Sequence, residues 1–299
     1  MDRTTETALR KLAERNKNRA RMLISCPDRP GIVAAVSQFL YEQGANIVQS
    51  DQYSMDPEGG MFFIRIEFDL EDFRRREPSL RDRFGEVAAR FGMKWELHQA
   101  ARRKRLAIFV SKEDHCLLEL LWQWQAGDLN ADIAMVISNH PDLKPLADSF
   151  GIPYHHIPVT AETKSQAEQR QLELLDGQID AVILARYMQI VSPNFVERYR
   201  NRIINIHHSF LPAFVGGKPY AQAHRRGVKI IGATAHYVTE ELDGGPIIEQ
   251  DVQRVSHRDN VDDLKRIGRH IERIVLARAV SWHVEDRIIV HDNKTVVFN

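Results

Sequence analysis

The segment Ala181–Ala185 reads AVILA, five apolar residues in succession. Such a run without alternation is typical of a strand that is buried on both faces of a parallel sheet. Outward from it, strands are predicted at 106–110, 133–138, 154–158, 181–185, 203–207, 232–238 and 247–255. Helices are predicted near 115–125, 142–150, 163–176 and 261–285, and a terminal strand pair at 287–298. Alternating strands and helices predict an α/β fold with a mostly parallel sheet covered on both sides.

The first hundred residues follow another order. Apolar residues in Ile32–Tyr41 recur at the three- and four-residue spacing of an amphipathic helix. Strands are predicted at 21–26, 46–55, 61–69 and 93–97, a turn at 56–60 and a second helix at 80–91. The order βαββαβ within about 80 residues is a ferredoxin-like plan.

These patterns divide the chain into four parts. We predict a polar tail at 1–19, a domain at 20–100, a linker at 101–105 and a second domain at 106–299. The linker reads ARRKR, and its four cations suit a solvated connection, although they could also contact a phosphate.

Composition excludes several classes of protein. The 299 residues carry 41 Lys and Arg against 41 Asp and Glu, and this balance argues against a nucleic-acid binder. No apolar run approaches the roughly 20 residues of a membrane helix, and the N-terminus lacks the apolar core of a secretory signal. Two cysteines, Cys26 and Cys116, form no disulfide framework. We therefore expect a cytoplasmic protein without nucleic-acid or membrane partners.

Polar residues gather in the segment 203–246. Side chains alternate along a strand, so Asn205 and His207 share one face of their strand, and Thr234 and His236 share one face of theirs. Asp243 lies in an Asp-Gly-Gly-Pro turn that could place its carboxylate over the sheet edge. Ligands of open α/β sheets bind at the carboxyl ends of the strands.

These residue types fit addition to a carbonyl. An amide and an imidazole can hold an oxyanion, and a carboxylate can transfer protons if burial or neighbours raise its pKa. Ser209 has no Gly-x-Ser-x-Gly context, so the pattern favours attack by water or an amine without an acyl-enzyme. Each residue also has a structural interpretation, since Asp243 could simply form a turn and His207-His208 could be a surface pair.

The motifs resemble a known family. Asn205-Ile-His207, then Ser209-Phe-Leu-Pro212 and Leu242-Asp243-Gly-Gly-Pro246, are similar to the signature of 10-formyltetrahydrofolate-dependent formyltransferases, over about residues 105–299. Asp28-Arg-Pro-Gly31 and Gly44-Ala-Asn46-Ile47 resemble an ACT domain. An ACT domain joined to this catalytic domain is the layout of the formyltetrahydrofolate deformylase family, which the stretches 184–190 and 218–220 also resemble. The resemblance implies a ferredoxin-like ACT domain followed by a Rossmann-like, formyltransferase-type sheet.

The resemblance also implies an activity: hydrolysis of 10-formyltetrahydrofolate to tetrahydrofolate and formate, which would supply formate for one-carbon and purine metabolism and balance the folate pool. Asn205 and His207 would then polarise the formyl oxygen, and Asp243 would shuttle the proton and position water. Supporting roles would fall to Thr234, His236 and His208, and substrate binding to Met188, Gln189, Ile190, Val191 and Gly244. The transferases of the family carry a cation where Gln189 stands and commonly a proline where His208 stands.

The ACT resemblance implies a regulatory role. A small amino-acid effector would meet Asp28, Gly31 and Asn46. The alternative is a purely structural or dimerising domain. Sheets of this type pair edge to edge, so we expect a homo-oligomer.

Two other functions stay open. The chain could transfer the formyl group to an amine acceptor such as glycinamide ribonucleotide, or act as a non-catalytic folate or amino-acid sensor. The segment Ser111–Cys116 reads SKEDHC, without the glycines that hold the acceptor phosphate in the related transferases, and its acids would repel one. This favours water as the acceptor. No His-Glu-x-x-His or Cys-x-x-Cys motif occurs, so we predict no metal and no cofactor beside the folate substrate.

Overall fold

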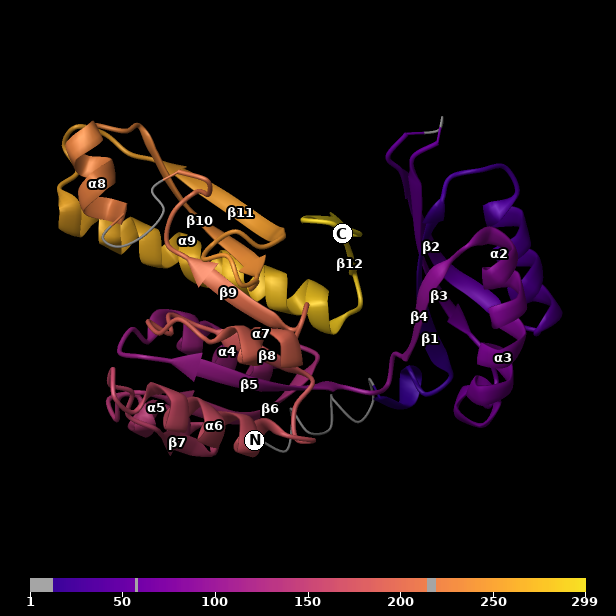
Figure 1. Ribbon diagram of the computed structural model, residues 1–299, viewed down its shortest axis with the longest axis horizontal. Coiled ribbons are helices and arrows are strands. Elements are labelled where there is room, and N and C mark those ends of the chain that lie inside the picture. The colour runs from indigo at the N-terminus through magenta and orange to yellow at the C-terminus, as the bar shows by residue number, and fades with distance from the viewer. Residues whose placement is uncertain (1–12, 57–58, 214–218) are drawn as a thin grey trace. The chain divides into compact units, whose positions relative to one another are not determined.

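The computed structural model describes residues 13–56, 59–213 and 219–299 (Figure 1). Its contacts divide the chain into two compact units. Among the described residues, the C-terminal unit contains Lys104–Val284 and Asp292–Thr295. The N-terminal unit contains the residues up to Arg103 together with Glu285–His291 and Val296–Asn299. Most of the predicted tail, residues 57–58 of the predicted turn, and Lys218 lie outside the described residues.

The N-terminal unit has the predicted βαββαβ order. Its antiparallel sheet has the strand order β2-β3-β1-β4. The elements are β1 (Arg19–Pro27), α2 (Ile32–Glu42), β2 (Asn46–Ser54), β3 (Met61–Asp69), α3 (Phe73–Phe91) and β4 (Lys94–Gln99). Helix α3 begins seven residues before the predicted position 80, because it accommodates Pro78 in its second turn.

The two faces of this sheet are covered differently. Helices α2 and α3 cover one face (Figure 1). Aromatic residues such as Phe68 and Phe84 belong to the hydrophobic core on this side. On the other face, Leu23 and Phe63 pack against Ile289 and Phe298 from the end of the chain. The sequence placed these last residues in the second domain, whereas the contacts group most of them with the first.

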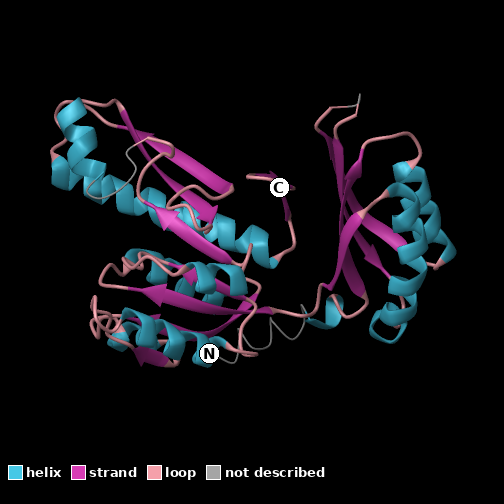
Figure 2. Ribbon diagram, viewed as in Figure 1, coloured by secondary structure: helices cyan, strands magenta, loops and turns pink. Residues whose placement is uncertain are grey.

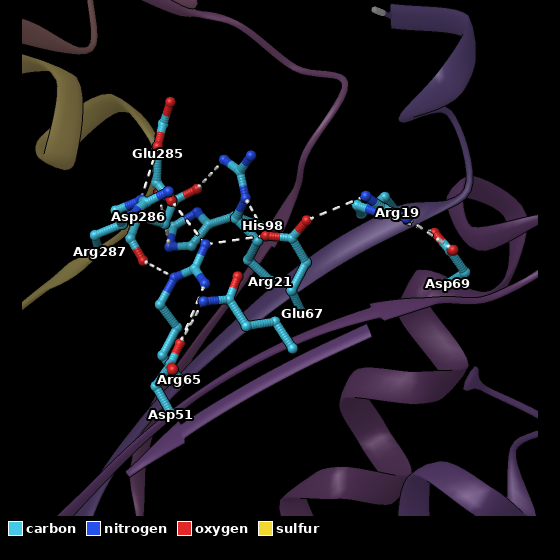
Figure 3. A network of polar contacts seen from close by, with 11 residues as sticks. Arg19, Arg21, Asp51, Arg65, Glu67, Asp69, His98, Glu285, Asp286 and Arg287 are labelled. Carbon is cyan, nitrogen blue, oxygen red and sulfur yellow. Dashed lines mark hydrogen bonds and ion pairs between the residues drawn. The ribbon is translucent and has the colours of Figure 1, made fainter. Parts of the chain in front are cut away.

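Buried arginines explain part of this grouping. Arg65 is fully buried on β3, and its Nε donates to the Asp286 carbonyl at 2.9 Å. Arg21 on β1 pairs with the Asp286 carboxylate at 3.4 Å and with Glu67 at 3.3 Å (Figure 3). A buried guanidinium needs acceptors, and the segment that begins at Glu285 supplies several of them.

The C-terminal unit is built on a seven-stranded sheet of order β11-β10-β9-β8-β5-β6-β7. Every neighbouring pair is parallel except those that include β10, so the predicted mostly parallel sheet is confirmed. The strands are β5 (Lys104–Val110), β6 (Ala131–Ser138), β7 (Tyr154–His156), β8 (Ala181–Leu184), β9 (Ile203–His207), β10 (Ile230–Tyr237) and β11 (Ile247–Arg254). The helices are α4 (His115–Ala126), α5 (Lys144–Ser149), α6 (Lys164–Leu175), α7 (Pro193–Arg198), α8 (Pro219–Arg226) and α9 (Val261–Val284) (Figure 2).

The structure differs from the sequence analysis at several points. Helices α7 and α8 were not predicted, because both are short and begin at proline. Strand β5 begins inside the predicted linker: Lys104 Nζ donates to the His283 carbonyl at 2.7 Å, and the Arg105 amide donates to Asp180 at 2.8 Å. An acceptor for the Lys104 side chain and another for the Arg105 backbone therefore let the strand begin at these two residues. The predicted terminal strand pair is present as β12 (Ile288–His291) and β13 (Lys294–Val297).

Across the described ranges, no helix combines the length and the apolar character needed to cross a bilayer.

Candidate active site

Strands β9 and β10 bring four polar side chains together. Their antiparallel register pairs Asn205 with His236 and His207 with Thr234. The isoleucines that alternate with them on β9, Ile204 and Ile206, are buried. The alternation predicted from the sequence therefore places all four polar residues on one face of adjacent strands.

Asp243 completes this group from the loop after β10. Its carboxylate lies 3.1 Å from His207 Nδ1 and 3.7 Å from His236 Nε2. Its backbone is left-handed, with φ of 55°. Aspartate tolerates this conformation better than most residues. The loop thus places one carboxylate between two imidazoles.

His236 orients the Asn205 amide. His236 Nδ1 lies 2.9 Å from the Tyr237 carbonyl, which can only accept a hydrogen bond, so Nδ1 carries a proton. In the neutral ring, Nε2 is then an acceptor for Asn205 Nδ2 at 3.2 Å. This bond fixes which end of the amide is the donor, and its second N–H remains available to a ligand.

The charge state of Asp243 differs from the sequence expectation. Burial disfavours the carboxylate, but the hydrogen bond and electrostatic attraction from His207, together with the His236 ring 3.7 Å away, outweigh burial and hold the pKa of Asp243 well below its ordinary value. Proton transfer by this carboxylate was expected from the sequence to need a raised pKa. Asp243 is instead ionised at neutral pH, so it begins as a proton acceptor.

A pocket of about 250 Å³ opens over these residues. His207 Nε2 is buried there and has no hydrogen-bond partner among the described residues. Asn205, His207, His236 and Asp243 border the pocket, as do the predicted binding residues Met188, Gln189, Ile190 and Val191. Met188 and Ile190 are 57% and 60% exposed, so this wall offers apolar surface to a ligand.

Family models match both units. A formyl transferase model matches residues 104–280, and an ACT domain model matches residues 20–85. The chain is 59% identical to a formyltetrahydrofolate deformylase of Bacillus subtilis, with 95% of each chain covered. It is 44% identical to that of Escherichia coli K12, over 91% of this chain and 95% of the relative. The chain belongs to the formyltetrahydrofolate deformylase family.

Solved structures agree with this assignment. A formyltetrahydrofolate deformylase from Pseudomonas syringae is 49% identical, with a TM-score of 0.89 over 94% of each chain. A glycinamide ribonucleotide transformylase from Symbiobacterium toebii is 30% identical, with a TM-score of 0.63 over 66% of this chain and 95% of its own. The deformylase layout predicted from the sequence, an ACT domain followed by a formyltransferase fold, is confirmed.

Two predicted site residues of this deformylase family member lie apart from the pocket. The Thr234 hydroxyl donates to the Ser209 carbonyl at 2.9 Å and accepts from the Leu211 amide at 3.0 Å. Thr234 thus shapes the turn after β9 instead of contacting Asp243. Gly244 does not border the pocket, and its carbonyl accepts a hydrogen bond from Asn293 at 2.9 Å.

His208 borders the pocket beside His207. The two rings are edge to face with centroids 5.2 Å apart, and His208 packs in the same manner on Tyr220 at 5.9 Å. Burial, together with the charge of Arg186, lowers the pKa of His208 to about 4. His208 is therefore neutral at physiological pH.

A buried polar cluster next to the pocket was not predicted from the sequence; it is formed by Arg186, Glu272, His115 and Tyr220. A charged residue within an apolar pattern, as at Glu272, is the signal that could have found it. His115, Cys116 and Glu272 offer ligand atoms within 4.8 Å of one another, a spacing that a metal ion could bridge. The Arg186 guanidinium lies 3.4 Å from the Glu272 oxygen that His115 Nε2 also contacts. Its positive charge already neutralises the Glu272 carboxylate. We therefore assign no metal to this cluster.

The three predicted effector residues do not form one group within a single chain. Asp28 accepts a hydrogen bond from Ser54, the last residue of β2, and Gly31 is close in sequence with φ of 94°. Asn46 is the first residue of the same nine-residue strand. At about 3.3 Å per residue, Asn46 lies roughly 26 Å from Ser54.

Proposed function

We propose that this protein hydrolyses 10-formyltetrahydrofolate to tetrahydrofolate and formate. The observation that carries the proposal is the unpartnered, buried Nε2 of His207, which lies beside the Asn205 amide in a pocket that also holds an ionised Asp243. Two donors for a carbonyl oxygen and one proton acceptor for water are the groups that formyl hydrolysis requires.

The residues suggest the following steps. Asn205 Nδ2 donates to the formyl oxygen, and so does Nε2 of His207 in its imidazolium form, whose Nδ1 donates to the Asp243 carboxylate. The carboxylate of Asp243 orients a water molecule and accepts its proton as the water oxygen adds to the formyl carbon. The two donors stabilise the negative charge of the tetrahedral intermediate. The intermediate then collapses: the bond from the formyl carbon to N10 breaks, Asp243 returns a proton to N10, and formate leaves. A second proton passes to solvent, which balances the reaction.

The segment after β5 supports water over an amine acceptor. Ser111 Oγ donates to Asn139 at 2.7 Å and accepts from the Met188 amide at 3.0 Å, so this hydroxyl is engaged within the protein. Glu113 and Asp114 follow at the start of α4. Two acids at this position would repel the phosphate of a nucleotide acceptor. The comparisons likewise do not favour a transferase or a non-catalytic sensor.

The test is release of formate and tetrahydrofolate, measured together from purified protein and 10-formyltetrahydrofolate without an added amine. We expect equal amounts of both products. Asp243→Asn should retain folate binding and lose most of the turnover. Binding without release by the wild type, or near-normal turnover by Asp243→Asn, would contradict the proposal.

We further propose that a small amino-acid effector binds the ACT unit at the Asp28–Gly31 turn. The ACT match and the open backbone at Gly31, where no atom lies within 4 Å of an added Cβ, support this. Thermal shifts with a panel of amino acids, repeated on Asp28→Ala, test the site. A shift that the variant retains would place the effector elsewhere.

A second copy of the chain is the proposed macromolecular partner. Strand β2 is an edge of its sheet, and seven of its nine residues are exposed, including Ile47, Val48 and Tyr53. An uncovered apolar edge strand is a template for pairing. Light scattering at the mass of one 34.5 kDa chain would overturn the proposal.

We propose that the reaction takes place in the cytoplasm and needs no metal or other cofactor. Both cysteines are buried and unpaired, which suits a reducing compartment. Asn205, His207 and Asp243 supply the proton acceptor and the oxyanion donors themselves. Turnover should survive EDTA treatment, and a loss that zinc restores would contradict this view.

A further inference from the structure

Glu272 is a buried carboxylate on a helix face that is otherwise apolar. Its side chain is 1% exposed, and the buried residues around it on α9 include Ile271, Val275 and Leu276. A charge in such surroundings is unfavourable unless other groups pair with it. The reaction steps proposed above do not use this carboxylate, so its presence needs a separate explanation.

Three side chains from three other segments converge on Glu272. His115 Nε2, at the start of α4, lies 2.8 Å from one carboxylate oxygen, and Arg186 Nε lies 3.4 Å from the same oxygen. Tyr220 of α8 donates its hydroxyl to the other oxygen. Burial opposes ionisation, but the hydrogen bond from His115 and the charge of Arg186 outweigh it and lower the pKa of Glu272 to about 2. The buried negative charge on α9 therefore binds side chains from three other segments of the fold.

Arg186 connects this cluster to the folate pocket. It borders the pocket and begins the lining segment 186–191. Its backbone is left-handed, with φ of 63°. A residue with a Cβ pays free energy for this conformation and keeps it only where its surroundings fix it. The ion pair with Glu272 fixes the side chain of the residue that makes this turn.

Tyr220 connects the same cluster to the histidines. Its ring packs on His208, whose ring packs on His207. Gly268, one turn before Glu272 on α9, makes room for Tyr220, because a Cβ there would lie 1.9 Å from the Tyr220 hydroxyl oxygen. Glycine is unfavourable within a helix, so Gly268 lowers the stability of α9 at the point where the Tyr220 hydroxyl reaches the Glu272 carboxylate.

We propose that Glu272 is a positioning residue for the reaction: by holding Arg186 and Tyr220, it fixes the segment 186–191 and His208 as walls of the folate pocket. Glu272 does not border the pocket, so its influence on the reaction passes through these two partners. When the pocket walls are fixed before the substrate arrives, less conformational entropy is lost on binding. This inference rests on the proposed function, since the pocket is taken to bind folate.

The test compares Glu272→Gln, Arg186→Gln and the double variant with wild type. KM for 10-formyltetrahydrofolate and Kd for tetrahydrofolate are measured for each. We expect each single substitution to raise both constants about tenfold while kcat changes less than about threefold, as expected for lost binding that is equal in ground and transition states. KM and Kd of the double variant should not exceed those of the more impaired single variant, because both substitutions remove the same ion pair.

Glu119→Gln is the matched control. It breaks another ion pair between α4 and α9, Glu119 to Arg273 at 3.7 Å, and neither residue borders the pocket. It should leave KM unchanged. If Glu272→Gln does not fold, Tyr220→Phe removes a single hydroxyl from the carboxylate and should raise KM as well, whereas Glu272→Asp should restore part of the binding.

A folded Glu272→Gln with a lowered melting temperature but unchanged KM and Kd would overturn the proposal. Additive effects on KM and Kd in the double variant would also overturn the proposal, because they would show that Arg186 and Glu272 act independently of each other. Tetrahydrofolate binding by a wild type that releases no formate would count against the proposed function instead. The Kd comparison would still decide the role of Glu272.

Discussion

At the scale of single residues, the Asn205 amide is the donor whose orientation the structure determines most fully. Its Nδ2 is fixed by His236 Nε2 at 3.2 Å. Loss of one oxyanion donor lowers kcat by roughly 10²–10³-fold in well-studied enzymes. We expect Asn205→Ala to lower kcat by a factor of this order with little change in KM, measured as formate release.

Thr234→Val is the control for this experiment, because Thr234 lies on the adjacent strand without contacting Asp243. Its hydroxyl serves Ser209 and Leu211, so the variant should lose about 1–3 kcal/mol of stability and keep most of its kcat. A loss of kcat in Thr234→Val as large as that in Asn205→Ala would show that the hydroxyl takes part in the site itself.

Glu272 gives the acid stability of the protein a defined pH range. Its pKa falls from an ordinary value of 4.5 to about 2 in the folded state. A carboxyl group with a lowered pKa stabilises the fold above its unfolded pKa, and this stabilisation is lost as the pH falls toward the folded pKa. We expect the unfolding free energy from urea titrations to drop between about pH 4.5 and pH 2, with a shallower drop in Glu272→Gln. Equal slopes in the two proteins would refute this assignment.

At the scale of elements, the glycines of two helices should respond oppositely to alanine. Gly→Ala within a helix ordinarily stabilises by about 1 kcal/mol. Gly85 in α3 has no atom within 4 Å of an added Cβ, so Gly85→Ala should stabilise. At Gly268 in α9 the Cβ would overlap Tyr220, so Gly268→Ala should destabilise by about 1–3 kcal/mol. Thermal or urea unfolding measures both changes, and a stabilised Gly268→Ala would show that Tyr220 moves aside without cost.

At the scale of the whole molecule, the end of the chain should matter most to the N-terminal unit. Phe298 packs with Leu23 and Phe63 in a core separate from the one under α2 and α3. We expect Phe298→Ala to cost about 3–5 kcal/mol. Amide hydrogen exchange should show the lost protection in β1 and β3. An equal loss in β8 and β9 would mean that the effect is not confined to this unit.

Local patterns explain why so much of the architecture was predictable. Unbroken apolar runs such as Ala181–Leu184 mark buried parallel strands, and alternation marks β3. Helices α7 and α8 escaped prediction because each is short and begins at a proline, a residue that ordinarily interrupts a helical pattern. The association of Phe298 with Leu23 joins opposite ends of the sequence, and no local pattern encodes such a contact.

The site shows the same division between local and distant information. Alternation along β9 and β10 was enough to group Asn205 with His207 and Thr234 with His236. The lowered pKa of Asp243 was not predictable, because it depends on where a loop places one carboxylate relative to two rings. The cluster around Glu272 was missed for a similar reason, since its four members come from four separate segments.

The path of the last fifteen residues bears on any attempt to dissect the protein. Glu285–His291 and Val296–Asn299 belong to the N-terminal unit, and the short stretch between them belongs to the other. A fragment that ends at Val284 lacks the Asn293 side chain that holds the Gly244 carbonyl, next to Asp243. A fragment that starts at Lys104 and keeps the tail leaves Ile289 and Phe298 without Leu23 and Phe63. No single cut therefore yields two intact pieces, and each unit is best studied within the 299-residue chain.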